Sequence, residues 1–383
     1  MFDFPSTPSV GAVYTNGGVS YAWDGQAWNG GPVDPSNFLT SKLAQLAARN
    51  NILYNGDFSF SQKAGFAVNS VSGTYTGDGW LHGLQPGGFG SSKIVGRSVA
   101  LASPLRRGRY CIQFNCLTAK ATLAATDFIA LSHPIEGNDI APLSWGLATG
   151  VPAILRFGFK GPAGTYGVSL TDDGPSNYWN ASFTITAGQA NQDTIQVFTI
   201  PPPPATGSWV AGAAKAATLR IGLGAGSTYS GVVSNPAGAW MGTANIVSPT
   251  GGFNFLSSTA NIVEIFDVKL VGDYDNLGLV DPGMCATDYA TEFQRCQRYY
   301  QRDINITFTS YCIAGGGIGE NISLATPMRA APNPILRTAG TLLNCSAPTI
   351  AGVSSTNIWC SATVTALGNG TVANYIYDFD AQL

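Results

Sequence analysis

Thr194-Ile195-Gln196-Val197-Phe198-Thr199-Ile200 interleaves apolar and polar side chains, and four prolines, residues 201–204, follow it directly. A period of two predicts a β-strand with one buried face. Prolines lack a backbone N–H, so they predict the end of that strand and a stiff bend. Similar runs recur at residues 110–114, 153–159, 182–185, 219–223 and 262–270. Turn-rich segments separate these runs, so we expect an antiparallel jelly-roll sandwich over residues 51–272.

The composition fits a mostly β protein with few ions on its surface. Of the 383 residues, 45% are hydrophobic and only 11% are charged, and glycine contributes 47 residues. An ordinary domain carries about 25% charged residues. The formal net charge is −3, and Arg106-Arg107-Gly108-Arg109 is the densest basic stretch. We expect these arginines to lie in a solvated loop before a strand. Without a basic stripe to neutralise phosphates, nucleic acid is not an expected partner.

Membrane, metal and cofactor functions find little support in the sequence. No run approaches the ~20 apolar residues of a membrane helix, so we expect no membrane insertion. Seven cysteines without a C-x-x-C pair, and only two histidines, fit reduced thiols in a bacterial cytosol and argue against zinc. Asp57 and Asp267 stand at the two ends of the expected sandwich, where calcium stays a remote option. We therefore expect no metal and no cofactor.

The first 50 residues form two units. Alternation around Asn16-Gly17-Gly18 and a second turn at Asp24-Gly25 predict a three-stranded meander within residues 1–35. It is too small to be stable alone, so it should dock on something larger. Residues 36–50 predict a short helix in which Leu39, Leu43 and Leu46 repeat at spacings of four and three. This repeat favours either a self-association seam or packing on the chain's own domain.

A second, smaller β domain is expected at the end of the chain. Residues 273–302 read as a linker and a helix from Asp288 to about Gln301, whose aromatic stripe indicates core packing. Residues 304–308, 335–337, 357–364 and 374–380 then read as strands of a domain spanning residues 303–383. The overall fold class is therefore mostly β, with one short N-terminal helix and one linking helix.

Several motifs resemble phage fibre proteins, in the order in which those proteins carry them. Asp3-Phe4-Pro5, residues 8–11, Tyr14, residues 21–25 and Trp28 are similar to the N-terminal anchoring segment of fibre and collar proteins. Residues 51–58, 75–80, 224–229 and 263–270 resemble the start and end of a fibre jelly-roll module, and residues 292–301, 327–332 and 377–383 resemble the helix and C-terminal domain that follow.

This resemblance to phage tail and virion fibres covers nearly the whole chain. One departure is residues 271–275, which replace the usual Leu-Glu-Ala-Gly run and leave the join between the domains open. The resemblance implies a homotrimer in the virion, assembled in the bacterial host cytoplasm. It also implies a structural role, with another virion protein bound at the N-terminus, where Tyr21, Trp23 and Trp28 would form the anchor. Its distal partner would be a host cell-surface glycan or protein.

Catalytic residues are not identified, and we expect no enzyme. Asp172-Asp173 and the pair Asp273 and Asp275 stand in turn-like sequence, where aspartate bonds the local backbone. A Ser/His/Asp triad would need His82, expected in a strand, or His133, expected in a loop before Pro134. The alternatives left open are a glycan depolymerase and a purely structural head or collar fibre.

Receptor binding is the favoured use of the exposed aromatic residues. Tyr178, Trp179 and Trp240 stand beside Asn and Gly in loop-like sequence, and Tyr311 opens a glycine-rich stretch at residues 311–320. Flat rings beside amides suit sugars, which stack on apolar faces and accept directional hydrogen bonds. The Gly-Asn-Gly turn within residues 367–371 is a further candidate loop.

Overall fold

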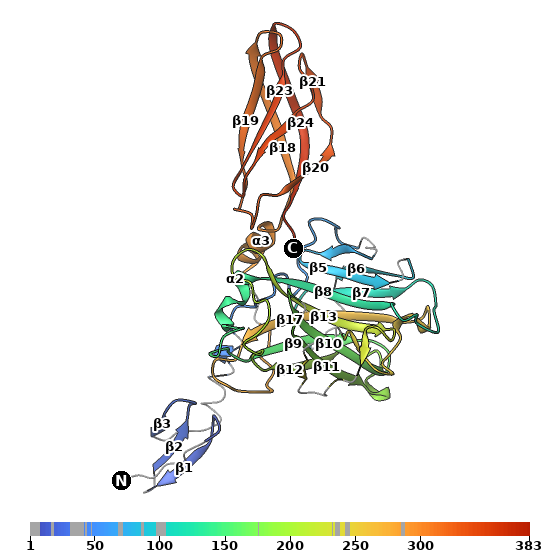
Figure 1. Cartoon of the computed structure of the whole chain (residues 1–383), viewed down its shortest axis with the longest axis vertical. Coiled ribbons are helices and arrows are strands. Elements are labelled where there is room, and N and C mark those ends of the chain that lie inside the picture. Colours follow the sequence, from blue (N-terminus) through green and yellow to red (C-terminus); the bar gives the residue numbers. More distant parts are fainter. Residues whose placement is uncertain are drawn as a thin grey trace.

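The computed structural model describes residues 8–16, 19–30, 42, 44–46, 48–67, 72–85, 88–96, 105–174, 176–231, 233, 238–241, 246–284 and 288–383. The molecule is mostly β, as the sequence predicts, and it has three parts arranged end to end (Figure 1). A small meander lies at one end, a large two-sheet sandwich lies in the middle, and an elongated C-terminal β domain projects from the other end. No helix in the described residues is long and apolar enough to cross a membrane.

The meander contains three antiparallel strands, β1 (Val13–Asn16), β2 (Val19–Trp23) and β3 (Trp28–Gly30). The turn between β2 and β3 forms as the sequence predicts, because the Asp24 carboxylate accepts from the Gln26 and Ala27 amides at 2.7 and 2.6 Å. Trp28 contacts both Trp23 and Tyr14, with ring centroids 5.7 and 6.2 Å apart. These rings form an aromatic cluster on the meander.

The helix expected at residues 36–50 is described only in part. Residues 42, 44–46 and 48 are helical, whereas Leu39 and Leu43 lie outside the described residues. Leu46 is fully buried and packs with Ile154 and Val271 of the sandwich. Of the two alternatives for this leucine, packing on the chain's own domain is therefore the one that the structure shows.

The sandwich consists of a seven-stranded and a five-stranded sheet that enclose one core. The first sheet has the order β15-β11-β10-β13-β8-β5-β4 and the second β12-β9-β17-β7-β6. The strands of the first are β15 (Ala239–Met241), β11 (Tyr178–Ile185), β10 (Gly164–Asp172), β13 (Lys215–Ala225), β8 (Phe128–Glu136), β5 (Trp80–Gln85) and β4 (Thr74–Gly77). Those of the second are β12 (Thr194–Ile200), β9 (Ala153–Lys160), β17 (Ile262–Gly272), β7 (Tyr110–Cys116) and β6 (Gly90–Gly96).

All pairs within these two sheets are antiparallel. The short strands β14 (Ser230–Gly231) and β16 (Ser248–Pro249) pair in parallel beside them. Aromatic rings fill the core between the sheets: Phe183 of β11 meets Phe157 of β9 edge to face at 5.4 Å. β12 ends at Ile200, directly before the four prolines, as predicted.

Helix α3 (Tyr289–Gln297) links the sandwich to the C-terminal domain. The Asp288 side chain caps its N-terminus by accepting from the Thr291 amide at 2.9 Å. The expectation that this helix reaches Gln301 is wrong, because Tyr300 already pairs with Asp380 in the first strand of the next domain. The sheet of that domain therefore begins three residues before the expected boundary at residue 303.

The C-terminal domain is a second, smaller sandwich. One sheet has the order β18-β24-β20, with β21 also paired to β24, and the other has the order β19-β23-β22. Its strands are β18 (Tyr300–Cys312), β19 (Gly317–Ser323), β20 (Asn333–Thr338), β21 (Thr341–Leu343), β22 (Thr349–Val353), β23 (Asn357–Thr363) and β24 (Gly368–Asp380). Ile306, Ile358 and Phe379 are fully buried in its own core.

The joint between the two sandwiches is held by polar contacts on several sides. Tyr299 donates to the buried Glu136 at 2.7 Å, and Arg298 pairs with the same carboxylate at 2.5 Å. On another side Lys63 forms an ion pair with Asp380 at 2.6 Å. Further bonds run from Tyr75, Arg302 and Arg329 to backbone carbonyls across the joint. So many bonds at separate points oppose bending of the C-terminal domain on the sandwich.

Candidate functional site

A cavity of about 960 Å³, here called the waist cavity, opens where the sandwich, the N-terminal helix and α3 meet. Nine of its 21 lining residues are charged, although charged residues make up only 11% of the chain. The nine are Arg49, Asp57, Arg107, Arg109, Asp139, Lys269, Asp288, Glu292 and Arg295. They come from segments that are far apart in the sequence, so the joint between the domains brings them together.

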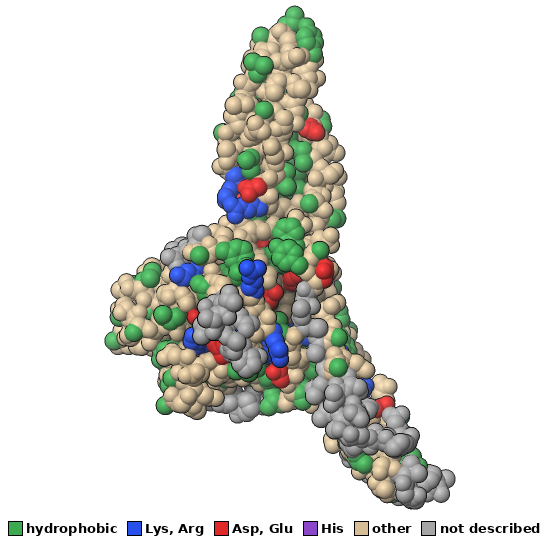
Figure 2. All heavy atoms as spheres, turned by 180° about the vertical axis from the view of Figure 1, so that it is seen from behind, with side chains coloured by type: hydrophobic (Ala, Val, Ile, Leu, Met, Phe, Trp, Pro, Cys, Tyr) green, Lys and Arg blue, Asp and Glu red, His purple; other side chains and the backbone are tan. Residues whose placement is uncertain are grey.

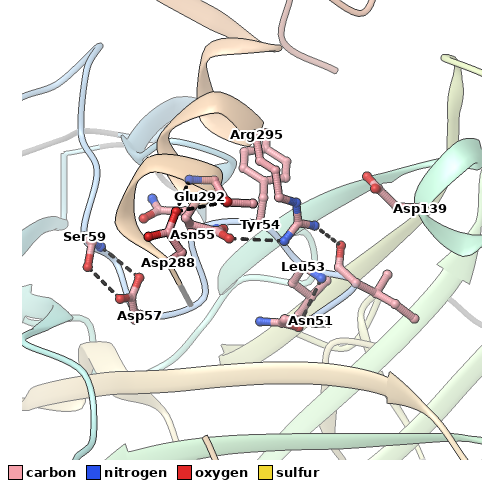
Figure 3. Close-up of polar contacts among 12 residues, drawn as sticks. Asn51, Leu53, Tyr54, Asn55, Asp57, Ser59, Asp139, Asp288, Glu292 and Arg295 are labelled. Atoms are coloured by element: carbon pink, nitrogen blue, oxygen red, sulfur yellow. Dashed lines mark hydrogen bonds and ion pairs between the residues drawn. The ribbon is translucent and has the colours of Figure 1, made fainter. Parts of the chain in front are cut away.

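One wall of the cavity is α3, whose charged residues also fix the start of the sandwich (Figure 3). The buried Glu292 carboxylate accepts from the Asn55 amide and, at 3.2 Å, from Arg295. Arg295 in turn donates to the Ile52 carbonyl at 3.2 Å. Since two of these bonds join α3 to residues 52–55 and the third joins the two side chains to each other, Glu292 and Arg295 are held in place before any ligand arrives.

Among the other carboxyl groups of the cavity, the pKa values of Asp139 and Asp288 are shifted in opposite directions. Hydrogen bonds from the Thr291 amide and hydroxyl lower the pKa of the exposed Asp288, so this group is ionised at neutral pH. Burial raises the pKa of Asp139, which accepts from the Tyr299 hydroxyl at 3.2 Å. Asp57 accepts from the amide and the hydroxyl of Ser59, the latter at 2.6 Å. The cavity thus offers both ionised and more readily protonated carboxyl groups.

The basic residues of the cavity differ in whether they are paired with a carboxylate. Arg49 is paired with Asp275 and donates to the Gly272 carbonyl at 2.7 Å. Arg107 and Arg109 are exposed, and neither guanidinium has a carboxylate partner within the part of the chain that the structure describes. The expectation of a solvated loop is wrong for the neighbouring Arg106, which pairs with Asp193 and Glu264.

Asp57 and Asp267, the remote candidates for calcium, both have protein partners. Asp267 accepts from the Arg107 and Gly108 amides at 2.6 and 2.7 Å, and these bonds hold the loop that carries Arg107 and Arg109. Among the described residues, no group of three His, Cys, Asp or Glu side chains could hold a metal ion. The charged side chains that line the waist cavity can bond hydroxyl, carboxyl or amide groups.

A second candidate surface is the free end of the C-terminal domain. Three connections lie there, at residues 313–316 between β18 and β19, 344–348 between β21 and β22, and 364–367 between β23 and β24. Tyr311, Ile313, Leu343 and Leu367 expose 68%, 68%, 64% and 66% of their surface. Figure 2 shows hydrophobic side chains gathered at this end, while charged side chains lie lower on the molecule.

Comparison with known proteins gives only distant likenesses. No family model matches the sequence, and no curated protein matches it significantly. Among solved structures, TmCBM61 in complex with β-1,4-galactotriose is similar at 13% identity and a TM-score of 0.29, covering 59% of this chain and 100% of that one. The bacteriophage CBA120 tailspike protein 4 domain has 10% identity and a TM-score of 0.27, covering 58% of this chain and 21% of that one.

A third likeness is the family 11 carbohydrate-binding module of a Clostridium thermocellum cellulase, at 12% identity and a TM-score of 0.22, over 55% of this chain and 92% of that one. All three scores are low. These likenesses assign neither a family nor a ligand to this chain.

The three aromatic residues predicted in receptor loops lie in strands instead. Tyr178 and Trp179 belong to β11, and Trp240 of β15 stands directly opposite Trp179. Trp179 is fully buried, and Gly238 approaches its indole so closely that a Cβ there would lie 2.4 Å from Nε1. The prediction of a loop is wrong here, because residues 178–180 pair with β10 on one side and with β15 on the other, within a sheet. Tyr178 is also buried, whereas Trp240 is partly exposed and donates to the Pro201 carbonyl at 2.8 Å.

The other predicted binding residue, Tyr311, is exposed, but it lies in β18 and not in a loop. Of the stretch 311–320, only residues 313–316 connect strands, and residues 368–371 belong to β24. In the meander, Trp23 and Trp28 form an aromatic pair and Tyr21 is half-buried in β2. Contact of any of these residues with a receptor or a virion protein stays a prediction.

The histidines and aspartates weighed for catalysis occupy structural positions. His133 is buried in β8, so the loop expected there is wrong, and burial lowers its pKa to about 3. His82 lies in a strand, as expected, with Nδ1 3.0 Å from the Ser92 hydroxyl. Asp172 and Asp273 bond local backbone amides, which is the predicted turn role. Asp275 instead pairs with Lys42 and Arg49.

Sequence reasoning missed the waist cavity. Its best available signal was the pair Glu292 and Arg295, three residues apart on the predicted helix, a spacing at which side chains are neighbours. That spacing also occurs on ordinary surface helices. Nothing in the sequence indicated that Asp139 would approach the same helix.

Proposed function

We propose that this chain is a fibre or spike subunit of a phage virion, attached by its N-terminal meander and contacting a host cell-surface glycan with its C-terminal domain. The observation that carries this proposal is the placement of the two small β units at opposite ends of the sandwich (Figure 1). Such a layout separates an attachment end from a contact end. The virion, its homotrimeric fibre and the partner protein at the meander belong to the same proposal.

The rigid joint supports a role in presenting the C-terminal domain at a distance. Arg298 and Tyr299 bond Glu136 on one side, and Lys63 pairs with Asp380 on another. A flexible joint would lose part of the binding energy to ordering the domain on each encounter. Bonds at several points remove that cost before contact.

The chemistry of the free end supports an uncharged ligand. Tyr311, Ile313, Leu343 and Leu367 are exposed there, beside uncharged connections that include Gly315, Gly316 and Asn344. Exposed loops on a rigid β scaffold are where binding residues concentrate. Contacts of this kind act by stacking and hydrogen bonding and depend little on salt.

The test exchanges residues 303–383 for the same region of a related fibre and measures adsorption of the full-length chain to a panel of bacterial strains. We expect the preferred strain to follow the exchanged domain. Unchanged preference would place recognition in the sandwich, where the partly exposed Trp240 is the first residue to alter. If the wild-type chain adsorbs to no strain, the proposed function is wrong.

A glycan depolymerase is the second candidate, and the waist cavity is the observation that favours it. Glycoside hydrolysis needs one protonated and one ionised carboxyl group. Asp139, with a raised pKa, and Asp288, with a lowered one, line the same cavity. New reducing ends from bacterial polysaccharide, lost in both Asp139→Asn and Asp288→Asn, would favour the enzyme. A purely structural head or collar fibre would show neither adsorption nor hydrolysis.

A further inference from the structure

Trp359 is a large aromatic residue on the solvent side of the sheet β19-β23-β22. Its strand β23 alternates between the two faces of this sheet: Ile358 and Cys360 are buried in the domain core, whereas Trp359 is 45% exposed. Successive side chains of a strand point to opposite faces. The indole therefore belongs to the outer face of the sheet.

Two glycines leave room around this indole. Gly352 of β22 stands opposite Trp359, and Gly319 of β19 lies diagonally beside it. A Cβ at Gly319 would come within 2.9 Å of the indole Cζ2, so the ring lies against the backbone of its neighbour strand. With hydrogen in place of a side chain at both positions, the outward face of the ring stays open.

The side chains around the indole are polar and uncharged. Asn321 is directly opposite Trp359, and Ser361 follows two residues later on the same face. In the C-terminal domain, where residues 288–383 are all described, neither side chain has a hydrogen-bond partner inside the chain. The one acidic residue of β19, Glu320, stands opposite the buried Cys360 and so belongs to the other face.

We propose that this outer face is a glycan-binding platform, on which Trp359 stacks against the ring of a neutral sugar while Asn321 and Ser361 bond its hydroxyl groups. A pyranose ring offers an apolar face to a flat aromatic ring and hydroxyl groups to amides around it. The absence of charge on this face of the described domain selects a neutral sugar over a uronic acid. The inference rests on the proposed function, and it places the glycan contact on a named face.

A second copy of the chain fits this face less well. Two strands of seven residues and one of five, about 4.8 Å apart, cover roughly 300 Å², whereas a stable interface buries about 800 Å² per partner. Trp359 is also the only large apolar side chain exposed on this sheet. Exposed leucines that suit a protein interface, Leu336 and Leu342, lie on β20 and β21 of the opposite sheet.

The test measures binding of the full-length chain to an array of bacterial surface polysaccharides, followed by titration with neutral oligosaccharides of the polysaccharide that binds. Trp359→Ala should weaken binding roughly tenfold or more, and Trp359→Tyr, which keeps a flat ring, should retain most of it. Asn321→Ala should weaken binding by a smaller factor. The matched control is Leu147→Ala, at an exposed apolar residue of the large sandwich, which should bind as the wild type does.

Two results would overturn the inference and leave the proposed function standing. One is a Trp359→Ala variant that adsorbs to bacteria and binds polysaccharide as the wild type does. The other is a change in the oligomer mass of the purified chain on Trp359→Ala, which would make this face an interface between copies. If the wild-type chain binds neither bacteria nor any polysaccharide, the proposed function fails and the platform fails with it.

Discussion

The ring of Tyr54, at the start of the sandwich, stacks on the ring of Tyr299, directly after α3, with centroids 4.3 Å apart and planes 4° from parallel. Both rings are buried. This stack joins residues that are far apart in the sequence and forms part of the buried interior of the joint. Tyr299 also donates to Glu136 at 2.7 Å and to Asp139 at 3.2 Å, so one side chain combines the apolar and polar contacts of the joint.

Replacing Tyr299 should loosen the C-terminal domain. Tyr299→Ala removes the stack and the hydroxyl bonds, and we expect a loss of about 2–4 kcal/mol in the free energy of unfolding. Tyr299→Phe keeps the stack and should lose about 1–2 kcal/mol. Denaturant unfolding measures both, and limited proteolysis shows whether cleavage begins at the joint. The control, Tyr311→Ala, makes the same change at an exposed site; if it costs as much, the stack does not stabilise the joint.

A buried carboxyl group beside the joint should give stability a measurable pH dependence. Burial raises the pKa of Asp78 to about 6 from 3.8, although Gln62 donates two bonds of 2.8 Å to it. Because the folded pKa lies above the unfolded one, protonation favours the folded state. This contribution is complete below about pH 4 and is lost as the pH rises through 6, and it amounts to roughly 3 kcal/mol.

The matched variant is Asp78→Asn, which cannot titrate. Its stability relative to the wild type should be flat below about pH 4 and should rise in favour of asparagine up to neutral pH. Denaturant midpoints of both proteins across this range measure the difference. Asp288→Asn provides a control whose stability relative to the wild type should change with pH in the opposite direction, because hydrogen bonds from Thr291 lower the pKa of Asp288. A constant difference between Asp78→Asn and the wild type at every pH would contradict the raised pKa.

The local alternation of apolar and polar residues predicted those strands whose tertiary contacts agree with that alternation. Thr194 to Ile200 forms β12 with the predicted bounds, because the prolines after it cannot continue a ladder. At His133-Pro134 the sequence wrongly predicted a loop in place of β8, since proline is unusual within a sheet. Here β5 pairs with β8 only as far as Ser132, so the missing N–H of Pro134 costs that pairing nothing. The local sequence carries no sign of where a neighbouring strand ends.

The candidate sites were harder to predict, because burial and pairing decide them. Trp179 and Trp359 both lie within two residues of an asparagine in the sequence, yet one is fully buried and the other is 45% exposed. The difference follows from which sheet face each residue occupies, and that depends on the whole fold. Likewise Glu292 and Asp139 line one cavity only because α3 docks on the sandwich.

Removing residues 1–35 should leave a folded chain that no longer joins the virion. Among the described residues, the strands of the meander pair with one another, and Trp28 contacts the rings of Tyr14 and Trp23 within the same unit. We therefore expect the denaturation midpoint of the remaining sandwich to stay unchanged. Incorporation into particles, measured by quantifying the chain in purified virions, should be lost. Normal incorporation of the truncated chain would place the attachment site elsewhere.

The last prediction concerns the oligomer. Leu46 packs on its own sandwich, so it does not provide a seam between copies. The exposed leucines Leu336 of β20 and Leu342 of β21 lie at an apolar sheet edge instead, and an open edge of this kind invites pairing with another chain. We expect light scattering at micromolar concentration to give three times the chain mass of 39.9 kDa. Leu336→Lys with Leu342→Lys should dissociate this trimer, because two ammonium groups would be buried at each contact. Leu147→Lys, at an exposed leucine of the sandwich, should leave the mass unchanged. A monomeric wild-type chain would contradict both the trimer and the fibre.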